Sequence, residues 1–236
     1  MNKFRETGIE IGRIRQVLKQ VRLLILDFDG PVCSVFSKLP GATIAERLRQ
    51  VLLLGGVKKI PTSVEQSDDP FCVFRYAASI GEILGNAVEN ALTQQEIEAV
   101  SSARPTPGAV DLIHSWHRSG RDVSIASNNS LACVDLYVEE HGLRPYLSAV
   151  HGRRSWDPSE LKPSPYLLRK AMEESGIAGE YALFIGDSLS DIFAAKEAQI
   201  TSCGLANKSG KMEVFEMAKA DIIVPDMQTL LAALTN

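Results

Sequence analysis

The first strongly apolar segment of the chain ends abruptly in two aspartates, and this feature constrains the fold most. Residues 21–26 are aliphatic except for one arginine, and Asp27, Asp29, Gly30 and Pro31 follow within five positions. An apolar run stopped by glycine and proline is typical of a strand buried on both faces of a parallel sheet. Such a sheet needs helices on both faces. The 236 residues, 45% of them hydrophobic, are enough to form that core.

The C-terminal half of the chain alternates between short apolar runs and amphipathic segments. Strands are expected at residues 122–127, 148–151, 182–185, 200–202 and 221–224, with helices that begin near Thr106, Ser130, Pro165, Leu189 and Asp226. Repeated strand–helix units require right-handed crossovers, which give a doubly wound sheet. We therefore predict an α/β fold with a Rossmann-like parallel sheet core formed by residues 21–32 and 105–236.

Residues 33–104 show helical periodicity without a strand signal, and we predict an all-helical domain inserted into the core. Asp69 and Pro70 form an N-cap followed by proline at the first helical position, which predicts a helix through Leu84. Thr93 and Glu96 have the spacing of a capping box, which predicts a further helix to about residue 103. We call residues 33–104 the helical insert.

The first 20 residues are predicted to form an amphipathic helix. Apolar residues recur there at helical spacing, and the segment lacks the continuous apolar stretch of a secretion signal. A basic amphipathic helix can lie on anionic lipid. We favour the alternative that it packs on the core or on a partner subunit.

Composition excludes several classes of protein. A net charge of −4 argues against a general nucleic-acid binder, because binding to the phosphate backbone favours a basic surface. No run approaches the roughly 20 apolar residues that cross a bilayer. The four cysteines are far apart and form no C-x-x-C pair, so they are interpreted as buried thiols in a reducing compartment. We expect a cytoplasmic protein.

Polar side chains gather at one edge of the predicted sheet, where the carboxyl ends of parallel strands meet and ligands bind. The residues placed there are Asp27, Asp29, Ser127, Asn128, Lys162, Asp187 and Asp191. Two carboxylates about 4 Å apart repel by roughly 1 kcal/mol in water and about 4 kcal/mol at an effective dielectric constant of 20. A lysine and a divalent cation relieve this repulsion. All-oxygen ligands without histidine or thiol favour Mg²⁺, which in turn suggests phosphoryl chemistry.

The two aspartates after the first strand suit two chemical roles. Carboxylates two residues apart on an extended segment point the same way. Asp27, at the strand tip, is the predicted nucleophile toward phosphorus. Asp29 is expected to protonate the leaving oxygen and then to deprotonate a water molecule. That role requires a protonated carboxyl when substrate binds, so its acidic surroundings should raise the pKa of Asp29.

The remaining polar residues complete a phosphoryl site. The Ser127 hydroxyl and the backbone N–H groups from Asn128 onward are expected to bind phosphoryl oxygens at a helix N-terminus. Lys162 supplies positive charge. Asp191 is expected to orient Lys162 or a metal-bound water. The predicted metal ligands are Asp27, Asp29 and Asp187.

These residues resemble the haloacid dehalogenase superfamily, in the subgroup of phosphoglycolate phosphatases and β-phosphoglucomutases, which inserts a helical cap after its first motif. Residues 27–30 are similar to the first motif, with its nucleophile and its acid/base. Ser127 matches the second motif, Lys162 the third, and residues 186–191 the fourth. The resemblance implies that the helical insert closes over the substrate, excludes water and recognises the leaving group.

Two features of the first motif bear on function. Pro31 stands where relatives often have threonine or valine, and proline has no N–H to donate there. Dehalogenases and phosphonate hydrolases of the family lack the second aspartate, so Asp29 favours phosphate esters as substrates.

The sequence therefore predicts a magnesium-dependent phosphatase that acts on a small phosphorylated metabolite through an aspartyl phosphate. A phosphomutase of the same subgroup shares every motif and stays open as an alternative. A non-catalytic phosphate-binding regulator is disfavoured, because Asp29 and Lys162 are both present. We expect no nucleic-acid or membrane partner, and a monomer or homodimer.

Several other polar residues are given structural interpretations. His114 and His117 are expected at the surface without a metal, and Arg153 and Arg154 as a solvated basic pair. Arginines of the helical insert could contact the rest of the substrate, although each is expected to be exposed or salt-bridged: Arg47, Arg49 and Arg75.

Overall fold

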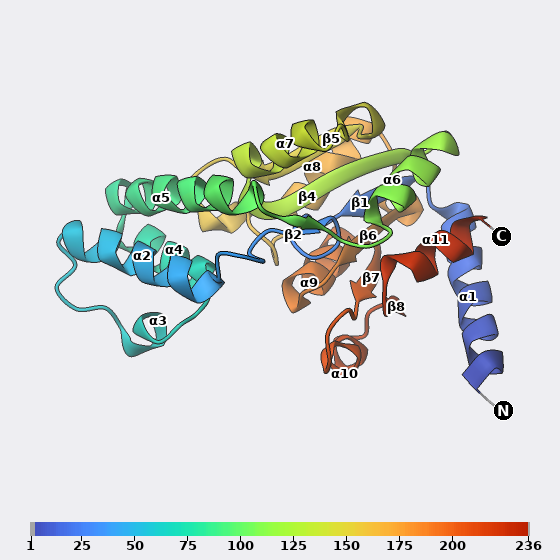
Figure 1. The fold of residues 1–236 in the computed structure, drawn as a ribbon, viewed down its shortest axis with the longest axis horizontal. Helices are drawn as coiled ribbons and strands as arrows, with labels where there is room; N and C mark the ends of the chain where they lie inside the picture. Colours follow the sequence, from blue (N-terminus) through green and yellow to red (C-terminus); the bar gives the residue numbers. More distant parts are fainter. Residues whose placement is uncertain (1–2, 236) are drawn as a thin grey trace.

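The structure is a computed structural model that describes residues 3–235, with side chains described from residue 11 to residue 234. Its centre is a parallel sheet in the order β5-β4-β1-β6-β7-β8. The strands are β1 (Leu23–Leu26), β4 (Asp122–Ser130), β5 (Ala149–Arg153), β6 (Ala182–Gly186), β7 (Thr201–Leu205) and β8 (Ile222–Val224). This topology confirms the predicted α/β doubly wound fold, with β1 between β4 and β6 (Figure 1).

Helices cover both faces of the sheet. They are α1 (Lys3–Gln20), α6 (Ala109–Arg118), α7 (Leu131–Glu140), α8 (Tyr166–Ser175), α9 (Leu189–Ala198), α10 (Lys211–Met217) and α11 (Met227–Thr235). Successive residues of β1 point to opposite faces, as the pleat requires. Leu24 belongs to the hydrophobic cluster that includes Trp116 of α6, whereas Ile25 belongs to the cluster that includes Leu168 of α8.

The N-terminal helix α1 packs on the core. Ile14 and Leu18 are buried in the hydrophobic cluster on one face of the sheet, and α1 contacts α11. Figure 1 shows the two helices side by side. In the described part of the chain, no helix is both long enough and apolar enough to cross a membrane.

The helical insert contains α2 (Gly41–Leu54), α3 (Thr62–Glu65), α4 (Pro70–Ile80) and α5 (Glu82–Val100). These helices have their own hydrophobic cluster, which includes Leu48, Phe74 and Val88. Figure 1 shows them gathered at one end of the molecule, beyond the sheet. Two short strands, β2 (Cys33–Ser34) and β3 (Arg104–Pro105), pair antiparallel where the chain leaves and rejoins the core. The sequence pattern gave no signal for this pair.

One predicted helix boundary in the insert is right and two are wrong. Asp69 caps α4, because its Oδ1 accepts from the Phe71 N–H at 2.9 Å. The helix ends at Ile80, not beyond Leu84, because Gly81 adopts a positive φ of 152° and α5 begins at Glu82. The predicted start at Thr93 is also wrong, since α5 runs through it.

Candidate active site

Asp27 and Lys162 form the buried centre of the site at the carboxyl edge of the sheet. Asp27 follows β1 directly, and its backbone N–H donates to Ile185 O on β6 at 2.8 Å. The Lys162 Nζ lies 2.6 Å from Asp27 Oδ1 and 2.7 Å from Asp191 Oδ1. Lys162 is only 2% exposed. The structure therefore brings together groups from three distant stretches of the chain, as the sequence predicts.

Asp191 is held by the start of α9 and holds Lys162 in turn. Its Oδ2 accepts from the N–H groups of Asp187 and Ser188 and from the Ser188 hydroxyl, at 3.1, 2.9 and 2.5 Å. The other oxygen, Oδ1, forms the ion pair with the Lys162 ammonium. A β-carbon on Gly186 would lie 2.2 Å from Asp191 Cβ, so only glycine allows this close approach. Both oxygens of Asp191 are thus engaged, Oδ2 by the start of α9 and Oδ1 by the Lys162 ammonium.

Asp187 packs against the first motif from β6. Gly30 has a φ of 112°, and a β-carbon there would lie 2.4 Å from the Asp187 carboxylate carbon. Glycine is required at this position for both reasons. Asp187 Oδ2 also lies 2.5 Å from Lys211 Nζ, at the first position of α10. Lys211 was absent from the predicted site, and no strand end or motif marks it in the sequence.

Asp29 lies beside this cluster, and its side chain is fixed by the backbone. Its Oδ1 accepts from the Val35 N–H at 2.8 Å. Within the described residues, the carboxylates whose oxygens lie within 4.8 Å of one another are Asp27, Asp187 and Asp191. Among the predicted metal ligands, the structure thus groups Asp27 with Asp187, whereas the side chain of Asp29 is outside this group.

Burial governs the ionisation of these groups. Burial raises the pKa of Asp27 to about 7; Lys162 opposes this shift, while Asp191 and Asp187 add to it. Burial also raises the pKa of Asp29 to about 6, with a smaller contribution from the charge of Asp187. The direction for Asp29 agrees with the prediction, although burial is the larger cause, ahead of the acidic surroundings. Asp191 and Asp27 outweigh the effect of burial on Lys162 and raise its pKa, so it stays protonated.

Ser127, Asn128 and Asn129 lie at the end of β4, next to Lys162. The Ser127 hydroxyl donates to Asn129 Oδ1 at 3.1 Å and accepts from the Asn129 N–H at 3.2 Å. The Asn128 side chain makes a reciprocal pair with the Lys162 backbone, donating to its carbonyl at 3.2 Å and accepting from its N–H at 2.8 Å. The side-chain amide of Asn128 thus fixes the segment that carries Lys162, and the predicted binding of phosphate by the Asn128 backbone N–H stays a prediction.

A cavity of about 430 Å³ joins these residues to the helical insert. Its floor is formed by Asp27, Asp29, Ser127, Lys162 and Asp187, and its opposite wall by Asp69, Phe71 and Arg75 of the insert. Arg75 Nη2 pairs with Asp69 Oδ2 at 3.1 Å. The other two arginines singled out in the insert do not line this cavity; Arg47 pairs with Glu98, and Arg49 with Glu46.

Arg153 departs most from its predicted environment. The sequence predicts a solvated basic pair, but the Arg153 side chain is 1% exposed and bridges the sheet to the insert through Glu89 and Glu96. Arg154 is exposed. Sequence reasoning missed this ion pair because its partners are 57 positions apart. On α6, His114 and His117 contact the ring of Tyr146; His117 is exposed, and His114 is half-buried.

The cluster of carboxylates around Asp27 and Asp187 is suited to a hard divalent cation. Oxygen atoms of Asp27 and Asp187 lie close together on a buried edge, with space for further oxygen ligands in the cavity. Mg²⁺ binds through one or two carboxylates and retains waters or substrate oxygens. Softer metals favour histidine or thiolate. Of the described cysteines, Cys33, Cys133 and Cys203 are buried and none lines the cavity.

Comparisons with known proteins identify a matching family and two similar phosphatases. The family model for haloacid dehalogenase-like hydrolases matches residues 75–205, more than half of the chain. Phosphoglycolate phosphatase from Salmonella typhi is 32% identical over 128 residues, which cover 54% of this chain and 50% of that protein. The Vibrio cholerae phosphoglycolate phosphatase is 32% identical over 115 residues, covering 49% and 50%. The chain thus spans about half the length of the curated relatives it matches.

Solved structures share the fold over most of the chain. CbbY from Rhodobacter sphaeroides, as a mutant in complex with xylulose-(1,5)bisphosphate, superposes with a TM-score of 0.65 at 20% identity, covering 91% of this chain and 99% of that one. A predicted phosphatase from Clostridium acetobutylicum gives a TM-score of 0.67 at 18% identity, with 89% and 96% covered. At these identities the likeness concerns the fold alone.

Proposed function

Because the chain belongs to the haloacid dehalogenase-like hydrolases, we propose that it is a magnesium-dependent phosphatase. Its substrate is a small phosphorylated metabolite, which it hydrolyses through an aspartyl phosphate on Asp27. The observation that carries this proposal is the buried Lys162 between Asp27 and Asp191, directly below a cavity of about 430 Å³. The phosphoglycolate phosphatases among its relatives support the substrate class.

The two aspartates of the first motif divide the chemistry. An oxygen of Asp27 attacks phosphorus, forming the aspartyl phosphate while the bond to the leaving oxygen breaks. Asp29 gives its proton to that leaving oxygen. It then accepts a proton from water as the water attacks the aspartyl phosphate, which releases inorganic phosphate and restores both carboxyl groups. A pKa of about 6 suits a group that must hold and release a proton near neutral pH.

The other residues position charge around the phosphoryl group. The Ser127 hydroxyl, with its proton turned from Asn129 Oδ1, and the Asn128 backbone N–H bind phosphoryl oxygens, and Lys162 offsets the charge of those oxygens. Asn128 keeps Lys162 in place through its backbone. Asp191 orients the Lys162 ammonium.

Asp27 and Asp187 are the side chains proposed to hold Mg²⁺, and Asp29 stays a predicted contributor from the same motif. When bound, Mg²⁺ would offset the repulsion among these carboxylates and the substrate phosphate and would favour the ionised form of Asp27. The small cavity favours a metabolite over a phosphoprotein. The four free cysteines fit a reducing compartment, and we propose the cytoplasm.

A panel of phosphorylated metabolites assayed with Mg²⁺ tests the function. We expect release of inorganic phosphate from at least one small phosphate ester, and loss of that release when EDTA removes the metal. A hexose 1-phosphate belongs in the panel, because conversion to the 6-phosphate without phosphate release would identify a phosphomutase instead.

Asp27→Asn supplies the matched blank for this panel. The substitution removes the nucleophilic oxygen and keeps the side-chain shape, so turnover should fall by at least about a thousandfold, while the circular dichroism spectrum stays that of the wild type. Substantial residual turnover in this variant would exclude Asp27 as the nucleophile.

A further inference from the structure

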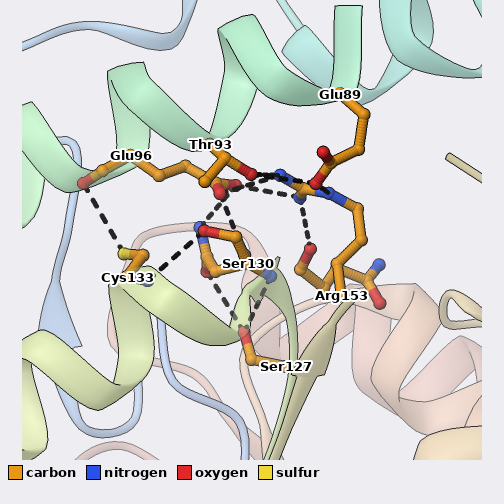
Figure 2. Close-up of polar contacts among 9 residues, drawn as sticks. Glu89, Thr93, Glu96, Ser127, Ser130, Cys133 and Arg153 are labelled. Atoms are coloured by element: carbon orange, nitrogen blue, oxygen red, sulfur yellow. Dashed lines mark hydrogen bonds and ion pairs between the residues drawn. The ribbon is translucent and has the colours of Figure 1, made fainter. Parts of the chain in front are cut away.

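A buried ion pair joins the helical insert to the segment that follows Ser127. Glu96 on α5 is fully buried, and Arg153 at the end of β5 is almost fully buried. Arg153 Nη1 and Nη2 donate to Glu96 Oε1 and Oε2 at 3.1 and 2.9 Å. Figure 2 shows Glu89, Thr93 and Glu96 along one side of the helix, with the Arg153 guanidinium reaching toward them.

The same ion pair holds each of the three residues that follow Ser127. Asn128 O accepts from Arg153 Nη1 at 2.7 Å. Asn129 Nδ2 donates to Glu96 Oε1 at 3.2 Å, and the Ser130 N–H donates to Glu96 Oε2 at 2.9 Å. The backbone at the end of β4 is thus fixed from the insert as well as from the sheet.

The contact to Asn129 extends to the Ser127 hydroxyl. Because the Asn129 amide nitrogen faces Glu96, its carbonyl oxygen faces Ser127 and accepts the hydroxyl proton at 3.1 Å. The Asn129 N–H donates to the Ser127 oxygen at 3.2 Å, which keeps that oxygen in place when its proton turns to a phosphoryl oxygen. Ser127 and Asn129 both line the cavity, whereas Glu96 does not. Glu96 therefore acts on the cavity through Asn129 and not by direct contact.

On the basis of the proposed function, we propose that Glu96 is a positioning residue for Ser127 and that α5 thereby takes part in binding the transferred phosphoryl group. The insert then contributes to both ends of the substrate. Arg75 and Phe71 line the cavity on the insert side, and Glu96 sets the phosphate-binding segment below. Binding of phosphate depends on the docking of α5 against the sheet.

Glu96→Gln is the informative substitution, because every contact of this carboxylate is with a donor. Each oxygen accepts from one nitrogen of Arg153 and from one group of the segment, Asn129 Nδ2 or the Ser130 N–H. A glutamine of the same shape must turn its amide nitrogen toward one of these two donors. Either orientation disrupts the segment without removing volume.

The test is the dissociation constant for inorganic phosphate in the presence of Mg²⁺, measured by calorimetry on the full chain. We expect Glu96→Gln to weaken phosphate binding by about tenfold, the loss typical of one hydrogen bond to a charged group. In a Ser127→Ala background, the same substitution should change the constant by less than about twofold, because the coupled partner is already absent. Asn129→Ala, which keeps the Arg153–Glu96 pair, should reproduce the effect if Glu96→Gln folds poorly.

Glu89→Gln is the matched control. Glu89 lies on the same helix and accepts from the same arginine, at 3.3 Å from Arg153 Nε, but it makes no hydrogen bond to residues 127–130. We expect its phosphate affinity to equal that of the wild type within twofold. Equal losses for Glu96→Gln with and without Ser127, or no loss at all, would overturn the positioning role. A wild-type chain that neither binds phosphate nor hydrolyses any ester of the panel would overturn the proposed function, and the positioning role with it.

Discussion

At the scale of single residues, the site offsets its carboxylates with cations supplied by the chain. Lys162 lies between Asp27 and Asp191, and Lys211 pairs with Asp187. The two lysines differ in their environment, because the Lys162 side chain is 2% exposed and that of Lys211 is 21% exposed. Lys211 can therefore move to solvent, whereas Lys162 cannot do so without opening the site.

This difference predicts the effect of Lys211→Met on metal binding. Asp187 is a proposed ligand of Mg²⁺, and the Lys211 ammonium both competes for its oxygen and repels a cation. Lys211→Met should tighten Mg²⁺ binding by about three- to tenfold in titration calorimetry. Lys170→Met removes the same charge from α8, where Lys170 pairs with Glu173, and should leave the affinity unchanged. Weaker binding in Lys211→Met would contradict this assignment.

A second residue-scale prediction concerns His151 on β5. Burial lowers the pKa of His151 below 6.5, and Arg154 and Lys170 lower it further, whereas Glu174 opposes the shift. The folded chain thus takes up this proton at a lower pH than the unfolded chain does, so His151 destabilises the fold as the pH falls through 6.5. His151→Gln should reduce that loss.

Urea unfolding at pH 7.5 and 5.5 measures this effect. The free energy of unfolding of His151→Gln relative to wild type should rise as the pH decreases, by no more than about 1.4 kcal/mol per pH unit, the limit for one titrating group. An unchanged difference between the two pH values would show that His151 titrates alike in both states.

At the scale of secondary-structure elements, the contact of β5 with the start of α7 leaves no space at Gly152. A β-carbon there would lie 2.8 Å from backbone atoms of Leu131 and 2.9 Å from Asn129 O. Because both neighbours are backbone, they cannot yield as a flexible side chain would. The strand and the helix must separate to admit a methyl group.

Gly152→Ala should therefore destabilise the protein by about 1–3 kcal/mol and displace the segment next to Ser127. Urea unfolding measures the loss of stability. The displacement of the segment should raise the KM for a phosphate ester. Gly12→Ala is the control, since a β-carbon on Gly12 meets no atom within 4 Å. Wild-type stability and KM in Gly152→Ala would refute the steric argument.

The sequence predicts a helix boundary correctly where neighbouring residues determine it. The predictions fail where contacts between residues far apart in the chain determine the structure. Asp69 and Pro70 mark the start of α4 because a cap involves only neighbouring groups. The capping-box spacing of Thr93 and Glu96 has another cause, because both side chains contact Arg153. A carboxylate placed on one helix face for a tertiary ion pair is indistinguishable, by spacing alone, from one that caps a helix.

Part of the candidate site could also be predicted from the sequence. Fold topology brings the ends of β1, β4 and β6 together, so the aspartates and Ser127 could be placed from the strand ends, and Lys162 from its position just before a helix. Lys211 and Arg153 could not, because each is defined by a partner far away in the sequence. The hydrogen bonds of Asn128 to the Lys162 backbone escape prediction for the same reason.

At the scale of the whole molecule, Arg153 links the sheet to the helical insert. Its guanidinium contacts Glu89, Thr93 and Glu96 and lies over the ring of Phe74, with 5.4 Å between its central carbon and the ring centroid. The insert has its own hydrophobic cluster, but Ala99 and Val100 of α5 belong to the cluster of the core, so this polar contact adds to apolar packing between the two parts.

Arg153→Met should cost about 3–5 kcal/mol of stability, because it leaves the Glu96 carboxylate buried without its cation. The double substitution Arg153→Met/Glu96→Met should recover a substantial part of that loss, since no uncompensated charge remains. Urea unfolding of the four proteins measures both quantities. A double variant as unstable as the sum of the two single variants would exclude a specific charge pair.

The paired strands β2 and β3 have an evolutionary consequence. Because Cys33 lies opposite Pro105 in that pairing, the chain enters and leaves the insert at neighbouring points. An insert of different length could therefore start and end at these two points without altering the order of the sheet. A replacement insert that leaves Arg153 in place would have to offer it a carboxylate, as Glu96 does, or the guanidinium would be buried without a counter-charge.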